Sequence, residues 1–165
     1  MFPGVTNDYG YILSDLVMDE LLHGKMEGVA QCDYFMLTNG DNLYSSRLLP
    51  SALPYMRTDI DLIGFEFLSH YSIKDNRVDH PGSDQTIHTQ FKTLWIDKGA
   101  AMFKADTIAR LNMTFALGFA REFGRLTTQV LGFKPTRIDG NFFTQLAQTE
   151  GVSSVIIRRT LLMHL

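Results

Sequence analysis

The pattern of hydrophobic and polar positions predicts strands that alternate with helices. Its most informative stretch is a continuous apolar run, Tyr34–Thr38, followed at once by a polar turn, Asn39–Asn42. Continuous apolar runs of this length are typical of strands covered on both faces. The turn places three side-chain oxygens around Gly40, which tolerates the backbone angles of tight turns. The stretch therefore predicts a buried strand that ends in a cluster of oxygen ligands.

Four further stretches have the apolar, β-favouring character of strands: Ile60–Tyr71, Phe91–Ile96, Ala101–Phe103 and Val155–Ile157. In the first of them, strict alternation makes Glu66 face away from Phe65 and Phe67. Residues 74–89 are polar and contain Pro and Gly, which predicts an exposed loop.

Apolar residues spaced three and four apart predict helices between these strands. The expected helices run from Ser14 or Asp15 to about Lys25, over Tyr44–Met56, from Asp106, over Thr114–Thr128 and over Asn141–Gln148. Pro50 and Pro54 are expected to break the second helix. The residues expected to point inward are Leu13, Leu16, Val17 and Leu21 in the first helix, and Leu48, Leu49 and Leu53 in the second.

Length and composition favour one domain. The 165 residues contain no linker or repeat, and 45% hydrophobic with 20% charged residues is ordinary for a globular protein. Alternating strands and helices then predict a single layered α/β domain over residues 1–165, with a mixed central sheet flanked by helices. No apolar run is long enough to span a membrane, and no signal segment opens the chain, so we expect a soluble protein.

Charge and motifs narrow the function classes. Residues 1–100 carry 7 Lys/Arg against 14 Asp/Glu (net −7), and residues 101–165 carry 8 against 4 (net +4). Basic residues in the second part either form an ordinary solvated surface or balance an acidic metal or anion site. No basic run with interleaved aromatic residues supports nucleic-acid binding. The P-loop, the Gly-x-Gly-x-x-Gly fingerprint, the Gly-x-Ser-x-Gly elbow and the His-Glu-x-x-His motif are all absent.

Four positions are candidates for chemistry, each with a simpler structural explanation. Asn39 and Asp41 can converge on a hard divalent cation, or they only satisfy an Asn-Gly turn. Asp97 follows a predicted strand and either accepts a sugar hydroxyl or caps a helix. Asp139 opens the Asn141 helix as a general base or as a plain N-cap. His164 is either a frayed terminal residue or a ligand beside the first strand.

The order of these segments resembles the GT-A-fold, Rossmann-like family of glycosyltransferases that use nucleotide sugars. Cys32–Tyr44 resembles the family's strand and metal-binding "DxD" turn, and Asp97–Ala100 resembles its Asp-x-Gly-Ala segment. Ile138–Phe143 resembles the acidic residue that precedes a Phe-bearing helix, and Thr160–His164 resembles the closing strand with its histidine.

The resemblance implies an enzyme that moves a sugar from a nucleotide-diphosphate donor to a hydroxyl of a glycan or another acceptor. Mn²⁺ or Mg²⁺ would be the cofactor. The implied roles are metal ligands for Asp41, Asn39 and His164, a catalytic base for Asp139, and substrate contacts for Asp97, Gly99, Ala100 and Arg158.

Two departures from the family pattern keep alternatives open. Asn39 stands where the family usually has its first acid, and few residues precede the first predicted helix. Either the chain is the C-terminal portion of a longer catalytic domain, or its donor site is incomplete. An incomplete site would favour a truncated or diverged, non-catalytic interaction module; a nucleotidyltransferase using the same turn is a third option. A complete chain implies the cytoplasm, and a fragment also allows the lumen of the secretory pathway.

Overall fold

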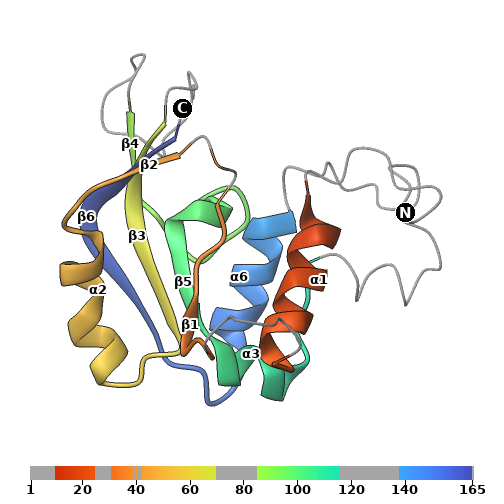
Figure 1. Cartoon of the computed structure of the whole chain (residues 1–165). Coiled ribbons are helices and arrows are strands. Elements are labelled where there is room, and N and C mark those ends of the chain that lie inside the picture. Colours follow the sequence, from red (N-terminus) through yellow and green to blue (C-terminus); the bar gives the residue numbers. More distant parts are fainter. Residues whose placement is uncertain are drawn as a thin grey trace.

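β3 (Leu62–Ser69) is the central strand of a curled, mixed sheet that helices flank (Figure 1). The computed structural model describes residues 10–24, 31–38, 40, 42–69, 85–115 and 138–164. Over these residues the predicted α/β architecture, with a mixed sheet and helices on its flanks, is confirmed.

Within the described residues, six strands form the sheet, in the order β1-β5-β3-β6-β2, with β4 paired to β3 beside this path. β3 runs parallel to β6, and the other pairings are antiparallel. The remaining strands are β1 (Tyr34–Phe35), β2 (Asn42–Tyr44), β4 (Gln85–Ile87), β5 (Ala101–Lys104) and β6 (Ser154–His164). β1 and β2 are the first and last strands of this order.

The sequence of β3 explains its central place. It lies within the predicted Ile60–Tyr71 strand, and its aromatic and β-branched residues are buried on both faces. Gly64 makes room for the ring of Phe91, because a Cβ there would stand 2.9 Å from that ring. This close approach packs the 91–95 turn onto the strand.

Several strand predictions were wrong. Residues 91–96 form a turn instead of a strand, with Leu94 at a φ of 72° and a bond from the Trp95 amide to the Lys92 carbonyl. The strand at Tyr34 covers two residues instead of five, and β2 and β4 occupy positions that we expected to be turn or loop. β2 and β4 have three residues each, so they owe their form to pairing with β6 and β3.

The helices were located better than the strands. Those in the described residues are α1 (Tyr11–Leu22), α2 (Leu48–Arg57), α3 (Ala105–Leu111) and α6 (Ile138–Gln148). α2 continues through Pro54, so the expected break did not occur, although its start lies four residues after the predicted one. Most of the predicted Thr114–Thr128 helix lies outside the described residues.

The inward faces of α1 and α2 were partly wrong. Leu13 and Leu49 are 65% exposed, Leu53 is 43% exposed and Val17 is 36% exposed. α1 instead buries Tyr11, Ile12, Asp15 and Met18. α1 has apolar residues on almost every side, so spacing alone does not select one face. Asp15 is buried because its Oδ1 accepts a hydrogen bond from the Phe115 amide at 2.6 Å.

An aromatic cluster fixes α6 against the sheet. The ring of Phe142 lies 5.7 Å from Phe103 of β5 and stacks on Phe115 at 3.9 Å. Phe143 lies 6.1 Å from Phe103 and is fully buried. Such ring pairs contribute about 0.5–1.5 kcal/mol each beyond their buried area. The start of α6 therefore has a defined place beside β5, which matters for Asp139.

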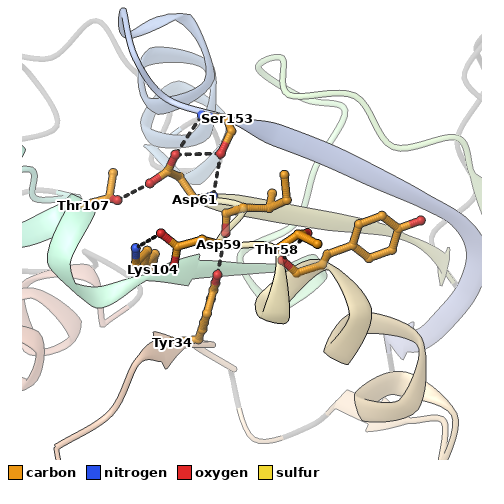
Figure 2. A network of polar contacts seen from close by, with 9 residues as sticks. Tyr34, Thr58, Asp59, Asp61, Lys104, Thr107 and Ser153 are labelled. Atoms are coloured by element: carbon orange, nitrogen blue, oxygen red, sulfur yellow. Dashed lines mark hydrogen bonds and ion pairs between the residues drawn. The ribbon is translucent and has the colours of Figure 1, made fainter.

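A polar network around Asp61 fixes the N-terminal end of β3 (Figure 2). The Asp61 carboxylate accepts hydrogen bonds from the Ser153 amide at 2.8 Å, from the Ser153 hydroxyl at 2.7 Å and from the Thr107 hydroxyl. Burial acts to raise the pKa of Asp61, but these hydrogen bonds outweigh it and hold the pKa below its ordinary value of 3.8. Asp61 thereby joins the starts of β3 and β6 to α3. Among the helices in the described part of the chain, none is long and apolar enough to span a membrane.

Candidate active site around Asp97 and Asp139

Asp97 organises the short 3₁₀ helix η1 (Lys98–Ala100) that leads into β5. Its Oδ1 accepts a hydrogen bond from the Gly99 amide at 2.8 Å, and its carbonyl accepts one from the Ala100 amide at 2.9 Å. The capping interpretation of Asp97 is therefore confirmed; a sugar contact would use the rest of its carboxylate. Gly99 and Ala100, the other two expected substrate contacts, are buried, and their amides already donate to Asp97.

Asp139 lies in the first turn of α6, which begins at Ile138. The N-cap interpretation was wrong, because the helix starts three residues before the predicted Asn141. The Asp139 carboxylate accepts hydrogen bonds from the Gly140 amide at 2.8 Å and from the Lys98 amide at 3.1 Å. The second bond joins α6 to η1, so it brings the two acids of the sequence prediction together.

Gly140 sets the position of this helix start. A Cβ at Gly140 would lie 2.7 Å from the Thr93 Cα and 2.9 Å from the Leu94 amide nitrogen. The adjacent Thr93 hydroxyl donates to Oδ1 of Asn141 at 2.5 Å. The 91–95 turn therefore packs directly on α6, and only glycine allows that approach.

The environment of Asp139 changes its acidity. Burial and the neighbouring negative charge of Asp97 raise the pKa of Asp139 from 3.8 to about 7, against the opposing effect of the Gly140 and Lys98 amides. A carboxyl group of this pKa exchanges protons near neutral pH, which is the property that general bases need.

Gly99 is also the meeting point of two side chains from β2. A Cβ there would stand 2.6 Å from Nδ2 of Asn42, 2.8 Å from the Tyr44 hydroxyl and 3.2 Å from Oδ1 of Asp97. The Tyr44 hydroxyl donates to the Gly99 carbonyl at 3.2 Å. The polar ends of Asn42, Tyr44 and Asp97 therefore share one small volume beside Gly99.

Asn42 carries an unusual polar atom. Its Oδ1 is buried and has no hydrogen-bond partner in the structure as described, while its Nδ2 donates weakly to the Thr38 hydroxyl at 3.4 Å. A buried acceptor without a partner costs about 1–3 kcal/mol, so native proteins seldom keep one without a ligand or a role for it. An amide oxygen of this kind can accept a hydrogen bond from a ligand or bind a cation.

Of the three expected metal ligands, His164 alone lies within the described residues. Asn39 and Asp41 lie outside the described residues. His164 is the last residue of β6 and pairs with Asn42 of β2 and with Ser69 of β3. The histidine therefore lies directly across the ladder from the residue that follows Asp41 in the sequence. Among the described residues, no three His, Cys, Asp or Glu side chains form a metal-binding group.

Arg158 has its contacts on β3 and the segment after β4. Its guanidinium donates to the Thr89 carbonyl at 3.0 Å and lies 3.5 Å from the Glu66 carboxylate. Glu66 is buried and also contacts Nδ1 of His88 at 3.1 Å. The Arg158 side chain is still 59% exposed, so it has surface for a further contact, although Glu66 already neutralises part of its charge.

Sequence reasoning missed four residues that contact this site: Tyr11, Asn42, Tyr44 and Lys98. Asn42 was visible as an oxygen in the turn, but the strand pairing that carries it to Gly99 was not. Tyr11 and Lys98 gave no signal, because a tyrosine in an apolar helix and a lysine in a turn are ordinary. Their place depends on how α1 packs against η1.

Comparison with models of known protein families found no match, and comparison with curated proteins found none either.

Proposed function

We propose that the chain is a glycosyltransferase that moves a sugar from a nucleotide-diphosphate donor to a hydroxyl acceptor. One observation carries the proposal: η1 holds the carboxylates of Asp97 and Asp139 together, and Asn42 and Tyr44 meet Asp97 at Gly99. Two acids with different environments beside hydroxyl-binding groups are the arrangement that proton abstraction from a bound sugar or alcohol requires.

The roles follow from the environments. Asp139, with a pKa of about 7, accepts the proton of the acceptor hydroxyl while that oxygen forms its bond to the sugar. The bond between the sugar and the diphosphate breaks, and the diphosphate leaves with the bonding electrons. Asp97, the Gly99 carbonyl and Oδ1 of Asn42 accept hydrogen bonds from sugar hydroxyls and so orient the donor.

Residues at the neighbouring strand ends would hold a divalent cation. Asn39 and Asp41 would supply the oxygen ligands that Mn²⁺ and Mg²⁺ prefer. His164 lies across from Asn42, and Oδ1 of Asn42 has no partner in the described structure. When bound, the cation would neutralise charge on the departing diphosphate. Arg158 would add a contact to the same diphosphate through its exposed surface.

Asp139→Asn tests the proposed base. Transfer to the acceptor should fall by at least about a hundredfold, because general-base catalysis contributes about 10²–10⁴. Affinity for the donor should change little, because Asp139 faces the acceptor in this scheme. In the parent protein the transfer rate should rise with pH through about 7 as the carboxyl ionises.

The measurements are single-turnover sugar transfer and donor binding for the parent and the variant. Asp106→Asn, at an exposed position of α3, is the matched control and should leave both unchanged. An equal loss of binding and transfer would contradict the role of a base. A stable parent protein with no affinity for the donor would favour the non-catalytic module. Release of the nucleotide without sugar transfer would indicate nucleotidyl or phosphoryl chemistry.

A further inference from the structure

A second polar cluster surrounds Glu66 of β3 and has no part in the proposed proton transfer. The Glu66 side chain is 10% exposed, and its Oε1 lies 3.1 Å from Nδ1 of His88 and 3.5 Å from Nη1 of Arg158. A buried carboxylate needs such partners, because an unpaired buried charge is costly. Of the two partner side chains, 42% of His88 and 59% of Arg158 is exposed. The cluster is therefore buried at its acid and open to solvent at its histidine and arginine.

Backbone contacts hold the Arg158 guanidinium in place. Its Nη1 donates to the Thr89 carbonyl at 3.0 Å. Thr89 is itself fully buried, and its hydroxyl donates to the Phe65 carbonyl of β3 at 2.8 Å. Both contacts of Arg158 in the described structure use Nη1, so Nε and Nη2 remain as donors for a ligand. A guanidinium with a fixed orientation is suited to bind a phosphate group through two hydrogen bonds.

Glu66 also determines which nitrogen of His88 carries the hydrogen. A carboxylate only accepts hydrogen bonds, so Nδ1 of His88 is the donor and the neutral ring has its lone pair on Nε2. His88 follows β4 and continues its alternation, because Ile87 and Thr89 are buried while His88 is partly exposed. A proton on Nε2 therefore converts an acceptor into a donor on the exposed side of the strand.

We propose that His88 and Arg158 together bind a phosphate group, and that this site forms when His88 is protonated. With a neutral histidine, the charges of Glu66 and Arg158 cancel. A proton on Nε2 adds one positive charge beside the exposed part of Arg158 and supplies a further hydrogen-bond donor. Because both side chains contact the same oxygen of Glu66, one phosphate group can reach both.

The charged groups near this site come from different segments. Glu66 contacts His88 from β3, and Arg158 contacts Glu66 from β6. In the following turn, the Lys92 ammonium lies over the Trp95 ring at 5.9 Å. The local balance is therefore one acid against one arginine, and the protonation of His88 decides whether the cluster attracts an anion.

Two hydroxyl groups extend the site. The hydroxyl oxygens of Thr86 in β4 and Thr160 in β6 lie 3.4 Å apart. Alternate residues of a strand face the same side, so Thr86 shares a side with His88 and Thr160 shares a side with Arg158. Two neutral donors next to the histidine and the arginine suit the several acceptor oxygens of a phosphate group.

The inference extends the role proposed for Arg158, and it depends on the proposed function only for the source of the phosphate group. A donor diphosphate and a free phosphate have the same chemistry at this site. Inorganic sulfate is the first probe, because it has the shape and the acceptor oxygens of phosphate and does not itself titrate near neutral pH.

Calorimetric titration of the full chain with sulfate, at an ionic strength held constant with chloride, tests the site. Affinity should fall about tenfold from about pH 5.5 to about pH 7.5, because the protonated fraction of a histidine of ordinary pKa, about 6.5, falls by that factor. His88→Gln should bind weakly and equally at both pH values. Glu66→Gln should bind sulfate at the higher pH as tightly as the parent does at the lower one, because Arg158 is no longer neutralised.

His23→Gln is the matched control, since Nδ1 of His23 also lies 3.2 Å from a carboxylate, that of Asp19, on the exposed surface of α1. It should leave sulfate binding unchanged. Arg158→Gln should weaken binding at least about tenfold at both pH values, the effect of losing charge-assisted hydrogen bonds. Arg159→Gln, at the next and also exposed position of β6, should not.

Sulfate affinity that is equal at both pH values, or that His88→Gln leaves unchanged, would overturn the proposal. If Arg158→Gln does not fold, Glu66→Gln decides, and an affinity at the higher pH no greater than that of the parent overturns the proposal.

UDP then identifies the source of the phosphate group. Displacement of bound sulfate by UDP would assign the site to the donor diphosphate, and UDP without displacement would assign it to another phosphate-bearing ligand. Sulfate binding that depends on His88, in a protein that transfers no sugar, would retain this inference and reject the proposed function.

Discussion

At the scale of single residues, Asp97 and Asp139 show how similar side chains acquire different roles. Asp97 gives Oδ1 to the amide of Gly99 and so caps η1. Burial and the neighbouring charge of Asp97 raise the pKa of Asp139 to about 7. The sequence identified both acids, yet their difference depends on packing that sequence spacing does not reveal.

Asn42→Ala tests whether the Asn42 side chain serves donor binding or the stability of the fold. The loss of Oδ1, which has no partner among the described residues, should weaken donor binding about tenfold, the value of one hydrogen bond of about 1–1.5 kcal/mol. The free energy of unfolding should stay the same or increase, because a buried unsatisfied acceptor has been removed. Calorimetric titration and urea unfolding measure the two effects.

Gln145→Ala, on the exposed side of α6, is the control for Asn42→Ala and should change neither quantity. A destabilised Asn42→Ala protein with unchanged donor affinity would mean that the Asn42 side chain only supports β2.

At the scale of elements, long and strongly patterned segments were predictable and short ones were not. β3 has eight residues of β-favouring sequence, and α6 has Phe142, Phe143 and Leu146 on one face, so both were expected close to where they lie. β2 and β4 have three residues each, and their form comes from partners far along the chain. For the same reason, the sequence did not predict that Asn42 of β2 lies beside Gly99.

Asp61→Asn tests the junction of β3, β6 and α3. The variant should lose about 1–3 kcal/mol of unfolding free energy at neutral pH, because an amide accepts the bonds from Ser153 and Thr107 less well than a carboxylate. The pKa of Asp61 is lowered on folding, so its contribution is present above about pH 4 and is lost as pH falls through the folded value.

Urea unfolding of the parent and Asp61→Asn from neutral to acid pH checks this expectation. Their stabilities should converge in acid. A difference that persists unchanged at low pH would show that the amide disturbs packing and that the charge of Asp61 contributes nothing. Asp106→Asn, at an exposed position of α3, is the matched control.

At the scale of the whole molecule, the structure joins some of the segments that carry the expected site residues. The start of α6 with Asp139 lies against η1, which Asp97 caps, and β6 brings His164 beside the strand that follows the Asn39–Asp41 turn. The two turn residues themselves lie outside the described structure, so their place as metal ligands stays a prediction. Arg158 was expected near a diphosphate and has its contacts with Glu66 and Thr89.

Donor binding tests the central claim most directly. The full chain should be titrated with UDP and with GDP, each with and without Mn²⁺, alongside Asp41→Ala, Asp97→Ala and the control Asp106→Asn. We predict binding of one of these nucleotides that requires Mn²⁺, is lost in Asp41→Ala, persists in Asp106→Asn, and extends to a sugar-bearing donor only when Asp97 is intact. Absence of Mn²⁺-dependent binding to either nucleotide, with Asp41→Ala indistinguishable from the parent, would contradict the account.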